Sequence, residues 1–177
     1  MRIPQLILAL AGTLMCTGCS ELVGLHPFVT DKEAALDARL LGVWVDDDDL
    51  YMVRQDGNGY TIGYSDKKSA AIYKLNAKML KVGEARILDL TPAEVDAFRI
   101  AAHTPLRVWM EGATLRIAFL DSKWLREHAS AELAVQEQEA GGRLVITSPG
   151  EEVTRFLLTY GGDDRAFGKP SVLRRQE

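Results

Sequence analysis

Alternation of apolar and polar residues runs through most of this 177-residue chain, and short turns containing glycine interrupt it. The clearest case is residues 50–65, where LYMVRQ and YTIGYS flank the turn sequence DGNG. Glycine and asparagine accept the positive φ angles that tight hairpins require, so this stretch predicts two antiparallel strands. Tyr60, Ile62 and Tyr64 fall on one face of the second strand. We therefore expect a sheet that buries one face.

Other segments with strand-like alternation lie on both sides of this hairpin. They are residues 40–45, 70–76, 85–90, 106–110, 114–120, 133–138, 143–148 and 171–175. Turns at residues 111–112 and 141–142 join the later segments into further hairpins. Consecutive short strands with glycine turns favour a mainly β fold (α+β), an antiparallel meander that is closed into a barrel or folded as a sandwich. We expect one such domain over residues 30–177, an ordinary length for a single core.

Capping-box motifs mark where helices are expected to begin. Thr30 with Glu33 predicts an N-terminal helix that ends before Gly42, and Ser148 with Glu151 predicts a C-terminal helix. The apolar residues of this C-terminal helix recur at helical spacing, as Val153, Phe156, Leu157 and Tyr160. Such a stripe indicates that the helix packs on the barrel. Shorter helical segments are predicted over residues 91–98 and 121–131.

The beginning of the chain has the layout of an export signal. Arg2 supplies a positive charge, residues 3–15 are mainly apolar but too few to span a bilayer, and small residues precede Cys19. The sequence CTGC at 16–19 resembles the lipobox of bacterial lipoproteins, with Cys16 where leucine is usual. The resemblance implies a signal peptide over residues 1–18 and lipid attachment at Cys19. The alternatives are a plain secretory signal, or a redox or metal role for the two cysteines.

Lipid attachment at Cys19 predicts where the domain is found. Several acyl chains anchor a protein stably where one alone does not. Ser20, rather than aspartate, follows the cysteine, and in lipoproteins of enteric type this implies the outer membrane, facing the periplasm. We expect residues 19–29 to be a short tether. If Cys16 leaves with the signal peptide, no free thiol remains in the mature chain.

The charge of the chain argues against a nucleic-acid binder. The formal net charge is -4 and the sequence pI is near 5.5, whereas binding of phosphates normally needs a basic face. Lysine and arginine do not cluster, apart from the short LRRQE at the C-terminus. We expect no nucleic-acid partner.

The segment LLGVWV at 40–45 resembles the Gly-x-Trp start of the first strand in lipocalins, with Gly42 and Trp44 as the matching residues. In lipocalins a late helix precedes the last strand, and an arginine near the end of the chain packs over this tryptophan. The resemblance implies a lipocalin-like barrel in which Arg174 or Arg175 lies on Trp44. A guanidinium over an indole face is a favourable contact.

The polar motifs of the chain do not form a recognisable catalytic pattern. The run DDDD at 46–49 is a candidate for calcium, but a solvated loop is favoured because four consecutive carboxylates cannot all face one ion. The serines lack a Gly-x-Ser-x-Gly elbow, and His103 is expected to be structural at the start of a strand. Acid pairs such as Asp89 with Glu94 arise by chance among 25 acidic residues. We expect no enzyme, cofactor or metal.

Aromatic residues are the remaining candidates for a site, because several fall on the predicted strands. Those that we expect to line a ligand cavity, or to fill the core instead, are Tyr51, Tyr60, Tyr64, Tyr73, Trp109 and Phe119. A cavity predicts a binding module for a small hydrophobic ligand or lipid. A filled barrel predicts an interaction protein, such as an inhibitor or an assembly accessory for an envelope partner.

Overall fold

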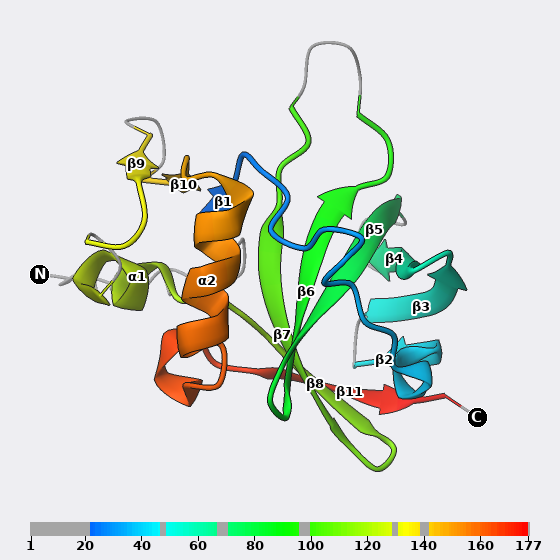
Figure 1. Cartoon of the computed structure of the whole chain (residues 1–177). Helices are drawn as coiled ribbons and strands as arrows, with labels where there is room; N and C mark the ends of the chain where they lie inside the picture. The colour runs from blue at the N-terminus through cyan, green and yellow to red at the C-terminus, as the bar shows by residue number, and fades with distance from the viewer. Residues whose placement is uncertain are drawn as a thin grey trace, which may run out of the picture.

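The computed structural model describes residues 22–46, 49–66, 71–95, 100–128, 131–138 and 142–176, so Cys16, Cys19 and Ser20 lie outside the described residues. Eight antiparallel strands close into a barrel in the order β11-β2-β3-β4-β5-β6-β7-β8 (Figure 1). The strands are β2 (Gly42–Val45), β3 (Asp49–Asp56), β4 (Gly59–Asp66), β5 (Ala71–Val82), β6 (Ala85–Pro92), β7 (Thr104–Glu111), β8 (Thr114–Phe119) and β11 (Ser171–Arg175). The expected mainly β fold with an antiparallel barrel is confirmed, and the sandwich alternative is not adopted.

A small second sheet lies beside the barrel and has the order β1-β10-β9. Its strands are β1 (Leu22–Gly24), β9 (Val135–Glu137) and β10 (Leu144–Ile146). The predicted hairpin over residues 133–148 is thus formed outside the barrel. β1 pairs in parallel with β10, so that Leu22 lies opposite Leu144. The sheet joins the N-terminal segment to a late hairpin, since β1 lies more than 100 residues before β9 and β10.

Residues 22–29, which the sequence predicts as part of a tether, belong to the folded domain. Leu22, Phe28 and Val29 are almost fully buried in a core that also contains Ile87 and Leu157. Removing these side chains from water stabilises the fold by roughly 1.5–3 kcal/mol each. The apolar residues of LVGLHPFV therefore pack against the domain instead of spacing it from a membrane.

The two helices of the described residues are α1 (Ser122–His128) and α2 (Gly150–Tyr160). The apolar stripe of α2 buries Val153, Phe156 and Leu157 in the same core as Ile87, which lies on the outer wall of the barrel. Figure 1 shows α2 beside this wall, with the small sheet at one end of the helix. Neither helix has the length and apolar character needed to cross a membrane, as far as the described residues show.

The expected N-terminal helix over residues 30–41 is not formed as an α-helix. Its capping box does form, because the Thr30 amide donates to the Glu33 carboxylate at 3.0 Å. The amide of Ala35 then donates to the carbonyl oxygen of Met79 on β5 at 2.9 Å, so the helical hydrogen-bond pattern cannot continue. Only a 3-10 turn follows, η1 (Ala38–Leu40).

Of the two shorter predicted helical segments, one contains a helix and the other begins as part of a strand. The segment 121–131 contains α1, whereas Thr91 and Pro92 of the segment 91–98 extend β6, where Thr91 pairs with Asn76 and Pro92 with Leu75. Residues 96–99 lie outside the described residues.

Candidate functional site

A cavity of about 520 Å³ lies inside the barrel. Ligand pockets in proteins are typically about 300–1,000 Å³, so the space suits a small molecule. Its walls are mainly aliphatic side chains of the strands, among them Val53, Ile62, Leu75, Leu88, Leu90, Leu106, Val108, Leu115, Ile117 and Leu173. Polar groups occur in the lining as Asp46, Asp49, Lys169 and Ser171.

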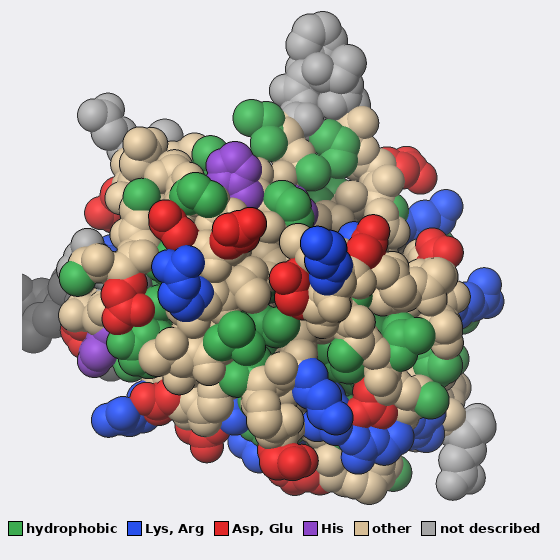
Figure 2. Space-filling view, in the orientation of Figure 1, with side chains coloured by type: hydrophobic (Ala, Val, Ile, Leu, Met, Phe, Trp, Pro, Cys, Tyr) green, Lys and Arg blue, Asp and Glu red, His purple; other side chains and the backbone are tan. Residues whose placement is uncertain are grey.

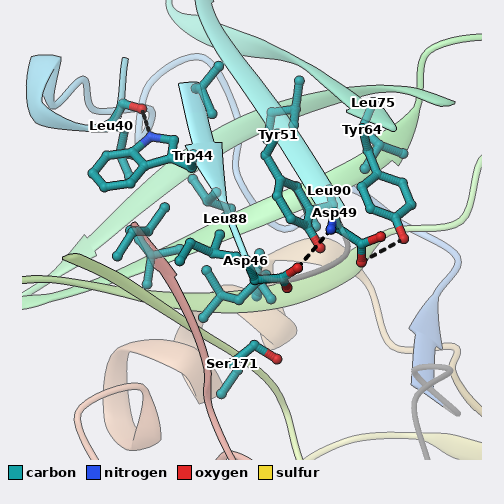
Figure 3. Close-up of a pocket in the computed structure, with 18 of the residues that line it drawn as sticks. Leu40, Trp44, Asp46, Asp49, Tyr51, Tyr64, Leu75, Leu88, Leu90 and Ser171 are labelled. Carbon is teal, nitrogen blue, oxygen red and sulfur yellow. Dashed lines mark hydrogen bonds between the residues drawn. The ribbon is translucent and has the colours of Figure 1, made fainter. Parts of the chain in front are cut away.

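The barrel is closed at the end where β2 begins and β11 ends. Trp44 is fully buried, and its indole Nε1 donates to the carbonyl oxygen of Leu40 at 2.8 Å (Figure 3). The guanidinium carbon of Arg175 lies 4.3 Å from the centre of the Trp44 ring. The same guanidinium donates to the carbonyl oxygens of Leu41 and Arg39, at 2.7 and 2.5 Å. Arg175 therefore ties the last strand to the segment that caps the barrel.

Gly42 and Arg175 depend on each other at this end. Gly42 has a φ of 126°, and a Cβ atom at this position would lie 2.7 Å from Nη1 of Arg175. Glycine is therefore favoured at position 42 both because it accepts the positive φ angle and because it leaves room for the Arg175 guanidinium. Of the two candidates for the tryptophan contact, Arg175 makes it, while Arg174 is exposed and pairs through its backbone with Val45.

The segment that caps the barrel is held by charge as well. Asp37 accepts hydrogen bonds from Arg39 and, at 2.7 Å, from Nε of Arg86 on β6. Hydrogen bonding from Arg39, together with Arg86, holds the pKa of the Asp37 carboxyl well below its usual range. The Asp37 amide donates to the hydroxyl of Tyr60 at 2.7 Å, which links this segment to the cavity wall.

Replacing Arg175 by alanine is expected to lower the free energy of unfolding by about 2–3 kcal/mol, since hydrogen bonds to a charged donor and an indole contact are lost together. Arg174→Ala is the matched control, because both side chains are exposed but Arg175 is the one that lies on Trp44, and we expect it to change this free energy by less than about 0.5 kcal/mol. Urea unfolding followed by circular dichroism measures both variants. Equal loss in the two variants would contradict the proposed closure role of Arg175.

The opposite end of the barrel carries the polar part of the cavity. Asp46 follows β2 and Asp49 begins β3, while Ser171 begins β11 and Lys169 lies two residues before it. The Asp49 amide donates to Asp46 at 2.8 Å, and the Tyr64 hydroxyl donates to Asp49 at 3.1 Å (Figure 3). Burial raises the pKa of Tyr51, and the carboxylates of Asp49 and Asp46 raise it further. We call this end the mouth.

The predicted calcium alternative for residues 46–49 gains no support from the part of the chain that the structure describes. Asp47 and Asp48 lie outside the described residues. Among the described side chains, no group of three or more histidine, cysteine, aspartate or glutamate residues is arranged to hold a metal ion. Asp46 instead accepts a hydrogen bond from the amide of Asp49.

The structure separates the six predicted aromatic residues into three groups. Tyr51, Tyr60, Tyr64 and Phe119 line the cavity. Tyr73 is exposed and stacks on Tyr64, with ring centres 5.7 Å apart, so it continues the row Tyr51–Tyr64–Tyr73 beyond the cavity. Trp109 packs against the outer core, with the guanidinium of Arg107 4.4 Å from its ring centre.

Most of the aliphatic lining was not singled out from the sequence, although a signal for it exists. Tyr60, Ile62 and Tyr64 define the inner face of β4, and pairing of β4 with β5 places Leu75 opposite Ile62. On β8 the same alternation places Leu115, Ile117 and Phe119 on the inner face. Alternation therefore identifies the residues that face the interior once strand pairing is known. It does not indicate whether their side chains fill the interior or leave a cavity.

His103, expected to be structural, lies outside the barrel cavity. Its Nδ1 donates to Asp89 at 2.8 Å, and both side chains are largely buried. The other oxygen of Asp89 accepts from the amides of Phe28 and Val29, at 3.1 and 3.4 Å. This network fastens the N-terminal segment to β6 and β7.

Comparison of the chain with protein-family models, with curated proteins and with solved structures found no match.

Proposed function

We propose that this protein is a lipid-anchored lipoprotein of the bacterial envelope whose lipocalin-like barrel binds a small hydrophobic molecule or lipid without catalysis. The observation that carries the proposal is the cavity of about 520 Å³ inside the barrel. Protein interiors are normally packed with few voids larger than a water molecule. A space of this size, enclosed by aliphatic walls, suits an apolar ligand.

The distribution of polarity in the cavity suggests an amphiphilic ligand. The walls contributed by β4 to β8 are mainly aliphatic, whereas Asp46, Asp49 and Lys169 lie at the mouth. A ligand with an apolar tail would place the tail among the strands and its polar end beside these groups. Hydrogen bonds at the mouth would then fix its orientation.

The lipocalin-like part of the proposal is supported by the arrangement at the closed end. Gly42, Trp44 and Arg175 form the contact that the resemblance implies, and α2 precedes the last strand. An eight-stranded antiparallel barrel with an interior cavity is compatible with such a fold. The alternative function, an interaction protein with a filled barrel, is less well supported because the interior of this barrel is not filled.

The anchor and the location in the envelope are supported by the sequence. The charged start, the apolar run and the small residues before Cys19 favour export and lipid attachment. Ser20 favours the outer membrane, facing the periplasm. No nucleic-acid partner and no cofactor form part of the proposal.

Reducing the space in the cavity is expected to weaken ligand binding. Leu75→Trp adds an indole to the inner wall, and we expect it to weaken binding of the neutral fluorescent probe N-phenyl-1-naphthylamine by about ten-fold or more, since about 1.4 kcal/mol of lost contact gives ten-fold. Lys74→Trp is the matched control, because Lys74 is the preceding residue on β5 and its side chain is 64% exposed. Titration followed by probe fluorescence measures both variants. Equal affinity of the two variants, or no binding to the unaltered protein, would contradict the proposal.

A further inference from the structure

Several large apolar side chains near the mouth are exposed to solvent. Their exposed fractions are 75% for Ile72, 51% for Tyr73, 41% for Val95, 76% for Ile100 and 38% for Phe119. Single exposed apolar residues are common on soluble proteins, whereas a group of them marks an interaction surface. We call these five residues the rim.

The topology of the barrel brings the rim residues to one end. β5 begins at Ala71, β6 ends at Pro92, β7 begins at Thr104 and β8 ends at Phe119. Neighbouring strands are antiparallel, so these strand ends lie at the same end as Asp49. Hydrophobic side chains gather in Figure 2 at the end of the barrel where β6 ends and β7 begins in Figure 1.

The N-terminal segment reaches the barrel beside this rim. Gly24 and His103 exchange backbone hydrogen bonds, with N to O distances of 2.7 and 2.9 Å. His103 directly precedes β7 and lies three residues after Ile100 in the sequence. Cys19 lies five residues before Gly24, and five extended residues span at most about 18 Å. A lipid on Cys19 is therefore held close to the mouth.

The same distances argue against the closed end as the side nearer the membrane. The eight residues of β7 rise about 23 Å along the strand, or roughly 18 Å along the barrel axis if the strand tilts by about 40°. The segment from Cys19 to Gly24 would cover this distance only if it were fully extended along the barrel axis. The closed end also carries charged groups such as Arg39 and Glu84 on its surface. The short reach of Cys19 therefore favours the rim over the closed end as the side nearer a bilayer.

We propose that the rim docks on the bilayer that holds the anchor, so that the mouth of the cavity faces the membrane and the ligand is an amphiphile taken from it. This inference rests on the lipid anchor of the proposed function. Apolar side chains beside tyrosine suit the boundary between head groups and acyl chains. The row Tyr51–Tyr64–Tyr73 then leads from the rim into the cavity.

Fluorophores placed at the two ends of the barrel test this orientation. The mature chain lacks a free thiol if Cys19 is lipidated, so Ile72→Cys and Ile100→Cys each give one site for an NBD label. Ala113→Cys, in the exposed turn between β7 and β8, is the control at the closed end. In phosphatidylcholine vesicles that carry the full lipidated protein, we expect brighter, blue-shifted emission from both rim labels and no change from the label at 113.

Flotation of the same vesicles separates the possible failures. Protein that floats, with rim labels that do not shift, would overturn the docking while leaving the anchor intact. Protein that does not float, or a Cys19→Ser variant that floats equally well, would overturn the anchor and with it the docking. A label at 113 that shifts instead of the rim labels would show the opposite orientation. Probe binding to the cavity is measured separately and does not depend on either result.

Discussion

Replacing Gly150 by alanine is expected to lower the free energy of unfolding by about 3 kcal/mol or more. A Cβ atom at this position would lie 1.9 Å from the carbonyl oxygen of Pro27 and 3.1 Å from its carbonyl carbon. Overpacking of this kind typically costs about 1–3 kcal/mol, and more where the opposing atoms belong to backbone that cannot move freely. Here α2 and the N-terminal segment would have to separate.

Other contacts hold the two elements together at this point. The Thr154 hydroxyl on α2 donates to the carbonyl oxygen of Phe28 at 2.5 Å, and Phe28 itself is buried in the outer core. Separation would therefore break a hydrogen bond and expose apolar surface in addition to relieving the clash. The expected loss is larger than the propensity difference between glycine and alanine, which favours alanine by about 1 kcal/mol within a helix.

Gly162→Ala is the matched control, because a Cβ atom at position 162 would meet no atom within 4 Å. We expect it to change the free energy of unfolding by less than about 0.5 kcal/mol. Thermal and urea unfolding of the two variants, followed by circular dichroism, give the comparison. If Gly150→Ala were as stable as Gly162→Ala, the N-terminal segment would not be packed on α2 as described.

The strands of the barrel could be predicted because their signals are local. Gly57, Gly83 and Gly112 have positive φ angles in turns that connect neighbouring strands, and alternation marks the strands on each side. β5 is longer than predicted, since it continues to Val82 while the sequence prediction ends at residue 76. Its continuation pairs with β6, and Lys78 and Lys81 interrupt the apolar pattern, one on each face of the strand.

The N-terminal segment could not be predicted from its own residues. LVGLHPFV contains glycine and proline, which are typical of a linker, and its strand forms only because β10 offers a partner more than 100 residues away. The same reason explains the missing N-terminal helix. Thr30 and Glu33 favour a helix locally, but the pairing of Ala35 with Met79 depends on the barrel wall.

The site was predictable in its aromatic part and less so in its aliphatic part. Tyr51 and Tyr64 lie on strands whose inner face follows from alternation, so their place in the lining could be expected. Trp109 belongs to a strand that is covered on both faces, and alternation alone could not decide which face its ring joins. The volume of the cavity depends on how all eight strands pack around it. It therefore cannot be predicted from any single segment of the sequence.

Replacing Asp89 by alanine is expected to lower the free energy of unfolding by about 3–5 kcal/mol. Asp89 is 4% exposed, and its carboxylate accepts from the amides of Phe28 and Val29 and from Nδ1 of His103. Removing one partner of a buried charged network leaves the others buried without an acceptor, which is costly. Asp89→Asn keeps one acceptor oxygen, so we expect an intermediate loss.

Asp31→Ala is the control for this prediction, since Asp31 contacts Lys78 at 2.8 Å but its side chain is 76% exposed. An exposed ion pair contributes little to stability, so the two aspartates should differ widely although their ionic contacts have equal lengths. Hydrogen exchange gives a local readout, because Asp89→Ala should speed exchange at the amides of Phe28 and Val29 while leaving the barrel strands protected. A variant that kept these amides protected would show that the carboxylate does not hold the N-terminal segment in place. The proposed docking orientation would then be weakened, because the reach of Cys19 is measured from this segment.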